Sequence, residues 1–290
     1  MQKNSNTEVM SLLAVSSTFP TLPDPLIERA NLIQTLHDML ADTEVVAIDG
    51  PEGIGKTTLL AEFAKGHPNT AFSLFVSGAS SYSYDCTMLS SDLSTQIGWA
   101  LKKENFRNEE TEEASQLLHS RILALQRQAN FEKKIYYFII DGLHEIPAED
   151  SSALEMIMKI LPFGLSRFRF LISGPAAMLS QRSVRPHNIS PLRVVGFTIE
   201  DTDKFFKGVV EDRSLIESIH QLSKMIPGNM VVLRRIITSG TSADTLLDSI
   251  STILPIGLNL SGKKSTEVQH THSKPWPHLH SIVVIYPSKY

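Results

Sequence analysis

The chain has little of several features that would assign it to a special class. It contains a single cysteine, Cys86, among 290 residues, which excludes an internal disulfide framework and favours a reducing compartment. No run of the sequence approaches the ~18–20 apolar residues that a membrane span needs. The polar N-terminus has no secretory pattern. We therefore expect a cytoplasmic protein with no membrane partner.

A charge of one sign is also absent. The 27 Lys and Arg residues against 31 Asp and Glu residues give a net charge of −4, and the isoelectric point is about 6.2. No global basic field therefore favours nucleic acid as a partner. The hydrophobic content of 42% and the charged content of 20% are those of an ordinary globular protein, long enough for one large domain or two modest ones.

The chain does contain a complete phosphate-binding motif. The pattern G-x-x-x-x-G-K-[ST] is matched at every position from Gly50 to Thr57. Residues 43–49 before it form a short apolar run typical of a buried strand, and residues 58–65 after it have helical spacing. A glycine turn that precedes a helix by chance is the alternative, and the complete match with both flanks disfavours it.

The chemistry of such a loop depends on its strand–loop–helix context. Backbone N–H groups curl round the β-phosphate, Lys56 reaches the β- and γ-phosphates, and the Thr57 hydroxyl ligates Mg²⁺. The sequence thus predicts that the chain binds a nucleoside triphosphate. The loop residues that we expect to hold it are Gly50, Pro51, Glu52, Gly53, Ile54, Gly55, Lys56, Thr57 and Thr58.

Strands and helices alternate along most of the chain. Strands are expected at residues 43–49, 71–76, 134–141, 168–173 and 192–196, with helices between them. This alternation predicts an α/β fold with a doubly wound parallel sheet of about five strands. One strand and two helices separate the phosphate loop from the strand 134–141, so we expect the additional-strand order 5-1-4-3-2.

The organisation outside the sheet is different. We expect an extended leader at 1–24, a nucleotide-binding domain at 25–197 and a small helical bundle at 198–253, opened by a capping signature at Thr198–Asp201. Residues 254–290 read as a flexible tail. Its four histidines at positions 270, 272, 278 and 280 form two H-x-H pairs that could bind Zn²⁺, but a tail without nearby Cys or carboxylate ligands is the favoured interpretation.

A second motif comes directly after the most apolar strand. Asp141 ends this strand, where an acid faces the phosphate loop and can hold Mg²⁺ through water. Glu145, four residues on, can orient and deprotonate an attacking water. We therefore predict Glu145 and Lys56 as catalytic residues, and Thr57 and Asp141 as metal-binding ones. A strand followed by an ordinary polar turn is the alternative.

These residues together resemble the signal-transduction ATPases with numerous domains (STAND), closest to the NACHT branch. Asp141-Gly142-Leu143-His144-Glu145 is similar to the NACHT acidic motif, usually Asp-Gly-Leu-Asp-Glu. The segment 26–29 is similar to the family leader, which implies that Arg29 borders the adenine. Residues 168–173 look like the sensor strand. Residues 227–233 resemble the segment that closes over the base, which implies a role for Pro227.

The resemblance implies ATP and ADP as ligands and a switch function, in which ADP holds a closed form and ATP drives self-association or partner binding in signalling or defence. The sequence departs from the pattern at His144, in place of an Asp, and at Gly174-Pro175, where an Arg usually senses the γ-phosphate. Residues 254–290 are too few for the winged helix and repeats of the family. The chain therefore looks like an isolated or truncated nucleotide module.

The sequence leaves three functions open. The favoured one is an ATP/ADP switch with slow Mg²⁺-dependent hydrolysis. The alternatives are a nucleotide-binding scaffold that does not hydrolyse, and an additional-strand ATPase that works on DNA. The acidic isoelectric point disfavours the last of these.

Overall fold

The computed structural model describes residues 21–78, 80–102, 114–180 and 188–240. The helix expected near 243–252 and the histidine-containing tail lie outside these ranges, as do residues 1–20 of the expected leader. Within them, no helix is both long enough and apolar enough to cross a membrane.

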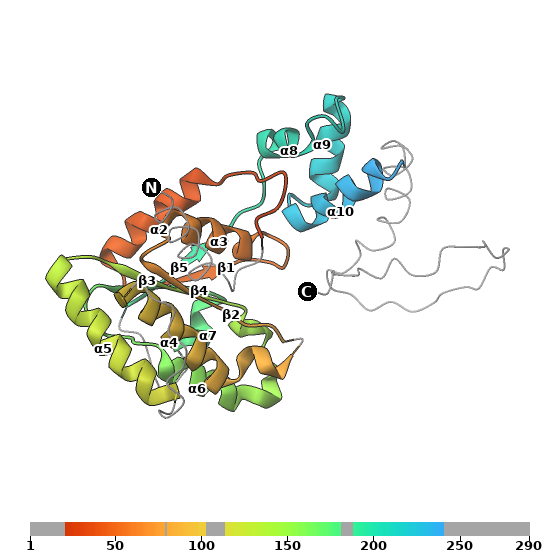
Figure 1. The fold of residues 1–290 in the computed structure, drawn as a ribbon. Coiled ribbons are helices and arrows are strands. Elements are labelled where there is room, and N and C mark those ends of the chain that lie inside the picture. Colours follow the sequence, from red (N-terminus) through yellow and green to blue (C-terminus); the bar gives the residue numbers. More distant parts are fainter. Residues whose placement is uncertain (1–20, 79, 103–113, 181–187, 241–290) are drawn as a thin grey trace, which may run out of the picture. The chain divides into compact units, whose positions relative to one another are not determined.

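The centre of the described chain is a five-stranded parallel sheet (Figure 1). Its strands are β1 (Val45–Asp49), β2 (Ala71–Phe75), β3 (Tyr136–Asp141), β4 (Phe168–Ser173) and β5 (Ile189–Arg193). The order β2-β3-β4-β1-β5 is the predicted one, so the fold class is confirmed. Because β4 lies between β1 and β3, the loops after β1 and β3 leave the same edge of the sheet two strands apart.

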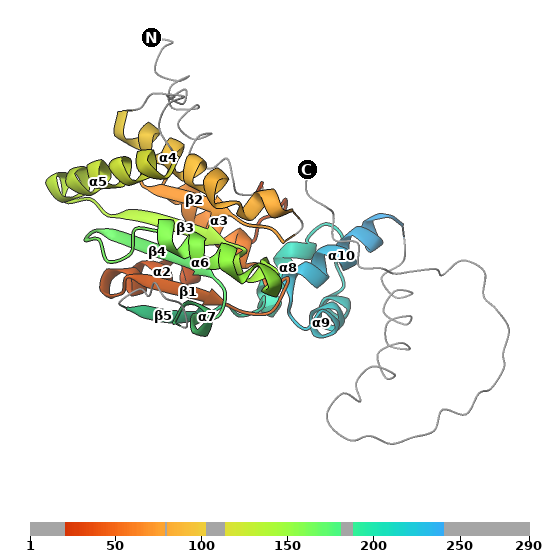
Figure 2. The ribbon, with the colours of Figure 1, turned by 90° about the horizontal axis from the view of Figure 1, so that it is seen from below.

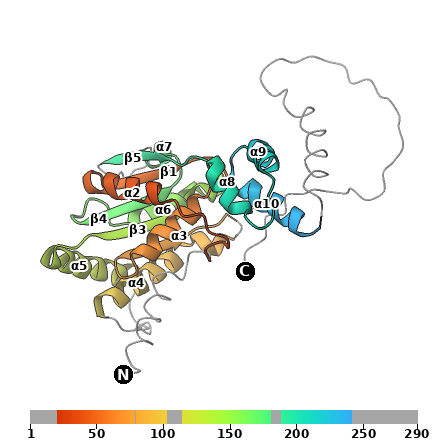
Figure 3. The ribbon, with the colours of Figure 1, turned by 90° about the horizontal axis from the view of Figure 1, so that it is seen from above.

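Helices cover both faces of this sheet. They are α2 (Ala30–Asp42), α3 (Lys56–Gly66), α4 (Cys86–Lys102), α5 (Ala114–Glu132), α6 (Ser151–Ile160) and α7 (Ala176–Ser180). Helices α2 and α3 pack on the face that carries Val46 and Ile48, whereas α4 to α7 pack on the face that carries Val45 and Ala47. Figure 2 looks onto the second layer and Figure 3 onto the first. Alternate residues of each strand are thus buried in the cores on opposite faces of the sheet. This explains why the strand sequences are unbroken apolar runs.

An aromatic cluster fixes the middle of the sheet. Phe138 of β3 lies 5.3 Å from Phe72 and 5.1 Å from both Phe168 and Phe170, measured between ring centroids. All four rings are fully buried. Burying such side chains is the main source of stability. The cluster therefore holds β3, and with it Asp141 at the end of that strand.

Among the described residues, three short helices come after the sheet: α8 (Ile199–Phe206), α9 (Arg213–Leu222) and α10 (Pro227–Thr238). The predicted capping signature is confirmed, since the Thr198 hydroxyl accepts the Asp201 N–H and the Asp201 carboxylate accepts the Thr198 N–H. Phe206, Ile219 and Met230 form the buried interior between these helices. Helices α8, α9 and α10 together are called the helical segment.

Helix α2 begins at Ala30, and residues 26 and 27 before it line a cavity. The last strand lies three residues earlier than expected, and its Pro191 is tolerated because β5 is an edge strand. Pro227 and Gly228 are the first residues of α10, where the fixed φ of proline and its missing N–H suit a helix start.

Candidate functional site

The loop between β1 and α3 turns through conformations that only glycine adopts easily. Gly53 and Gly55 have φ angles of 75° and 96°, and Gly55 is the N-cap residue directly before α3. A left-handed residue at this point brings the first N–H groups of the helix to face the bend of the loop. These groups have no partner within the helix, so this end of α3 suits an anion.

The Lys56 side chain binds back to the phosphate loop. Its ammonium Nζ donates to the carbonyl oxygens of Gly50, at 2.7 Å, and of Pro51, at 3.3 Å. These two residues therefore act through their carbonyl groups and do not line the cavity, although they were expected to hold the ligand. The positive charge lies at the centre of the loop.

Thr57 and Asp141 meet although 84 residues separate them. The Thr57 hydroxyl donates to Asp141 Oδ2 at 2.5 Å. A hydroxyl and a carboxylate are ligands that Mg²⁺ accepts, and Mg²⁺ is usually held by one or two protein oxygens with the rest from water and phosphate. The described residues contain no group of three or more His, Cys, Asp and Glu that could hold a metal ion. The pair fits a magnesium ion that arrives with its nucleotide.

Glu145 and His144 lie in a short turn directly after β3 and are both exposed. The turn is fixed from both sides: the Gly142 N–H donates to Ser173 Oγ at 2.9 Å, and a Cβ on Gly142 would lie 1.9 Å from the Val76 carbonyl oxygen. Glu145 Oε2 accepts the Gly78 N–H at 3.4 Å, a long hydrogen bond. His144 and Glu145 both line the cavity that the phosphate loop also lines.

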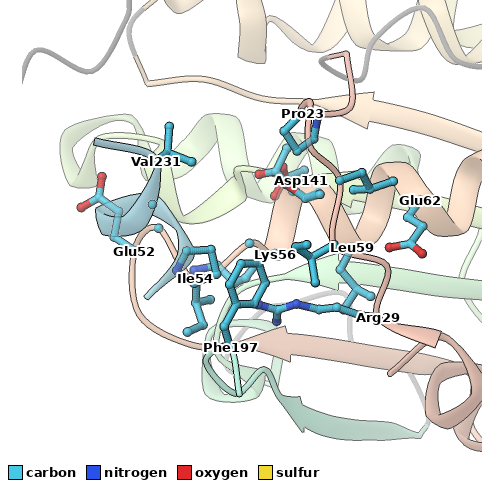
Figure 4. Close-up of a pocket in the computed structure, with 18 of the residues that line it drawn as sticks. Pro23, Arg29, Glu52, Ile54, Lys56, Leu59, Glu62, Asp141, Phe197 and Val231 are labelled. Atoms are coloured by element: carbon cyan, nitrogen blue, oxygen red, sulfur yellow. The ribbon is translucent and has the colours of Figure 1, made fainter. Parts of the chain in front are cut away.

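This cavity, of about 380 Å³, joins all these groups, and its volume is typical of small-molecule sites. The phosphate loop, Thr57, Thr58 and Asp141 form one end, which we call the phosphate end. The remaining walls, called the base end, are mainly apolar and come from the residues before α2, the linker before α8 and the helical segment. They include Pro23, Pro25, Leu26, Ile27, Phe197, Phe205, Pro227 and Val231. All the predicted site residues line the cavity except Gly50 and Pro51. Figure 4 shows Lys56 and Asp141 with Arg29 and Phe197 around it.

Arg29 lies where the two ends meet. Its Nη1 donates to the Val195 carbonyl at 2.9 Å, and its guanidinium carbon lies 4.9 Å from the centre of the Phe197 ring. Burial lowers the pKa of Arg29, against the opposing effect of the Asp201 and Glu62 charges. Its Nη2 is buried and has no hydrogen-bond partner among the described residues.

Several cavity residues were missed from the sequence, among them Glu62 and Phe197. Glu62 lies seven residues after Gly55, so it shares a helical face with the loop, and this spacing was a usable signal. Burial raises the pKa of Glu62, despite the hydrogen bond that its carboxylate accepts from the Arg29 backbone. Phe197 carries no such signal, because only the folding of the chain after β5 brings it to the cavity.

The chain belongs to the AAA ATPase domain family, which matches residues 25–172. It is similar in structure to a Walker-type ATPase of Pyrococcus abyssi, PABY2304, with a TM-score of 0.56 and 15% identity over 82% of this chain and 76% of that one. At this identity the likeness shows a shared fold. No curated protein matches the sequence.

Weaker structural matches include Cdc6p of Pyrobaculum aerophilum, with a TM-score of 0.43 and 14% identity over 84% of this chain. The ORC1 protein of Aeropyrum pernix, solved in complex with DNA, matches with a TM-score of 0.46 and 13% identity over 80% of this chain. The chain spans 66% of each of those two proteins. None of these comparisons supports the expectation that nucleic acid is not a partner. An ATPase domain is supported, while the STAND assignment stays a prediction.

Proposed function

We propose that the chain binds ATP and ADP with Mg²⁺ and works as a nucleotide-dependent switch of the STAND/NACHT-like type, with slow hydrolysis. The observation that carries this proposal is the shared cavity. Its phosphate end holds a complete phosphate loop beside Asp141, and its base end is lined by the helical segment. A ligand that fills both ends contacts the two parts of the molecule at once.

Each residue at the phosphate end has a role in this proposal. The N–H groups at the start of α3 and the Lys56 ammonium bind the phosphates, and Lys56 exchanges its loop carbonyl partners for phosphate oxygens. Thr57 and Asp141 would hold Mg²⁺, which neutralises charge on the phosphate oxygens. Glu145 orients the attacking water and accepts its proton.

Slow hydrolysis is inferred from the surroundings of Glu145. Its neighbour His144 stands where the resembling family has a second carboxylate, and Gly174 comes after β4 where that family has an arginine. A glycine supplies no cation for the charge that develops on the γ-phosphate. The same features favour a second candidate, a scaffold that binds nucleotide without hydrolysing it.

The switch itself depends on differential binding. Nucleotide changes the population of two arrangements only if it binds one of them more tightly. Pro227 and Val231 of the helical segment line the cavity together with the phosphate loop, so in this proposal a displacement of the segment changes the walls that the nucleotide contacts. We propose that this change controls self-association or a partner protein, in regulatory or defence signalling.

The test is phosphate release together with nucleotide affinity for the wild type, Lys56→Ala and Glu145→Gln. The switch predicts slow release that Glu145→Gln abolishes while affinity is retained, and Lys56→Ala loses both. Equal inactivity of the wild type and Glu145→Gln, with tight ATP binding, would support the scaffold instead.

The third function, an ATPase that works on DNA, needs a different experiment. Phosphate contacts release counterions, so the DNA affinity of such a protein falls steeply with salt. A steep salt dependence would favour this function over the signalling switch.

A further inference from the structure

The first residue after β4 is held in a conformation that only glycine adopts easily. Gly174 is buried, its φ angle is 137°, and its N–H donates to the Ile48 carbonyl of β1 at 2.9 Å. A Cβ at this position would lie 3.0 Å from Met178 Cε. The arginine that the resembling family carries here would therefore be strained. Any donor to a terminal phosphate on this side of the cavity comes from another residue.

His144 is the residue beside this position. Its Cβ lies 4.0 Å from the position of a Cβ on Gly174. This separation is no larger than that of directly opposite side chains in a sheet, about 4.5–5.5 Å. The His144 side chain thus begins next to the place where a side chain of residue 174 would begin. It is exposed, and it lines the cavity together with Asp141 and Glu145.

The turn that carries His144 is fixed by its neighbours. The Gly142 N–H donates to Oγ of Ser173, the last residue of β4, at 2.9 Å. Gly78, in the loop after β2, approaches the Glu145 carbonyl so closely that a Cβ on it would clash. The backbone of the turn is therefore held between β2 and β4, and the imidazole moves only through its own side-chain torsions.

Few donors of positive charge line the cavity. Among the described residues that line it, the side chains that can carry such a charge are Arg29, Lys56 and His144. Arg29 is held by the linker before α8. Lys56 lies within the phosphate loop, from which it reaches the β- and γ-phosphates. His144 remains, on the turn that follows Asp141.

An imidazole suits this position chemically. One of its ring nitrogens carries a proton in the neutral form and both do in the cation, so the side chain donates a hydrogen bond in either state. The resembling family has a carboxylate at position 144. A carboxylate has no proton to donate and reaches a phosphate only through a metal ion or water. The histidine therefore performs a different task from the acid that it replaces.

We propose that His144 donates a hydrogen bond to the γ-phosphate, so that the site distinguishes ATP from ADP. ADP lacks this phosphate, so the contact forms only with the triphosphate. The departures from the family pattern at positions 144 and 174 are then one exchange, in which the donor moves from the end of β4 to the turn after β3. A single imidazole N–H replaces the fork of an arginine, in agreement with the proposed slow hydrolysis.

The inference rests on the proposed nucleotide binding and deepens it, since a switch needs a contact that only one of its two ligands makes. The test is calorimetry of the full chain with Mg²⁺ and either ADP or the non-hydrolysable triphosphate adenosine 5′-(β,γ-imido)triphosphate. His144→Ala removes the donor, His144→Gln keeps one in its amide, and His144→Asp introduces the acid of the resembling family. His119→Ala is the matched control, because His119 is an exposed histidine of α5 outside the cavity lining.

We expect His144→Ala to weaken binding of the triphosphate about 10- to 100-fold, the range for a hydrogen bond to a charged group, and to leave the ADP affinity unchanged. His144→Gln should stay within about threefold of the wild type, because its amide donates in place of the imidazole. His144→Asp should lose at least as much as His144→Ala, because it adds a like charge. His119→Ala should behave as the wild type.

Three results would overturn the inference while leaving nucleotide binding intact. They are an unchanged triphosphate affinity of His144→Ala, an equal loss of ADP and triphosphate affinity in that variant, and triphosphate binding by His144→Asp as tight as in the wild type. The last result would mean that position 144 acts through the metal ion. If the wild type binds neither nucleotide, the proposed function fails and this inference with it. If His144→Ala does not fold, His144→Gln against His144→Asp decides, since only the first keeps a donor.

Discussion

The phosphate end and the base end of the cavity are built in different ways. At the phosphate end the polar groups already have partners: Lys56 binds two loop carbonyls and Thr57 binds Asp141. At the base end the walls are apolar, they come from the leader and the helical segment, and the Arg29 guanidinium keeps one buried donor unpaired among the residues that the structure describes. The polar groups of the first end are thus already paired, whereas the second end is apolar and keeps one unpaired donor.

We therefore expect the two ends to contribute differently to nucleotide binding. A preformed loop contributes affinity, because little ordering is needed when phosphate binds. An end assembled from distant segments responds to occupancy, because its contacts depend on how those segments are placed. Substitutions at the sheet, at each end and at their junction test whether the two tasks can be separated.

The largest effect is expected from Phe138→Ala. This substitution should destabilise the whole fold and so weaken the phosphate end and the base end together. Phe138 is buried in the centre of β3, the strand that ends in Asp141. Truncating a buried phenylalanine costs about 3–5 kcal/mol of unfolding free energy, measurable by urea denaturation. Phe131→Ala is the control, because that side chain is 90% exposed and should cost almost nothing. Similar losses for both variants would contradict the assignment of the core.

Asp141→Asn should affect the phosphate end alone. The amide oxygen still accepts the Thr57 hydroxyl, so the fold is kept, but the carboxylate charge that would hold Mg²⁺ is lost. We expect the gain in ATP affinity on adding Mg²⁺ to fall about 10- to 100-fold, measured by calorimetry with Mg²⁺ and with EDTA. Asp150→Asn is the control, because it also neutralises a carboxylate, one that accepts a hydrogen bond from the Tyr84 hydroxyl. An unchanged Mg²⁺ effect in Asp141→Asn would exclude this residue from the metal site.

Gly228→Ala should disturb the junction between the ends. A Cβ on Gly228 would lie 3.0 Å from Gly53 Cα and 3.2 Å from its carbonyl oxygen, so either the loop or α10 must shift. Overpacking of this kind costs about 1–3 kcal/mol and should weaken nucleotide binding as well. Gly66→Ala, at the end of α3 with no atom within 4 Å, is the control and should be neutral. Equal stability and nucleotide affinity of the two variants would contradict the prediction, because they would show that α10 and the phosphate loop can move apart without a cost.

The smallest effect concerns Glu62 of α3, which lines the cavity. Burial raises its pKa, so the folded protein holds this proton to a higher pH than the unfolded chain. Stability therefore falls as pH rises from the ordinary glutamate pKa through the raised one, and Glu62→Gln removes this fall. Between about pH 4 and 7, the urea midpoint of the wild type should therefore fall relative to that of Glu62→Gln as the pH rises. Glu200→Gln controls for the loss of an exposed carboxylate, and parallel curves for Glu62→Gln and the wild type would contradict the prediction.

The sequence predicted the phosphate end far better than the base end, for a physical reason. Residues 50–58 are contiguous, and their shape is set by glycine conformations and a helix start. Asp141 was found because an apolar strand in a parallel sheet fixes where its last residue lies. Phe197, in contrast, reaches the cavity only through tertiary packing, which no local spacing encodes. Arg29 was found by resemblance alone, and its unpaired donor became visible only with the fold.

The hydrogen bond from the Gly228 N–H to the Gly53 carbonyl, at 2.9 Å, has a consequence for any molecule that contacts α10. A molecule that pulls α10 away must break this bond and release the peptide group at the bend of the phosphate loop. Binding at the two places is then one linked equilibrium. Whatever factor such a molecule applies to nucleotide affinity, bound nucleotide must apply to the affinity of that molecule.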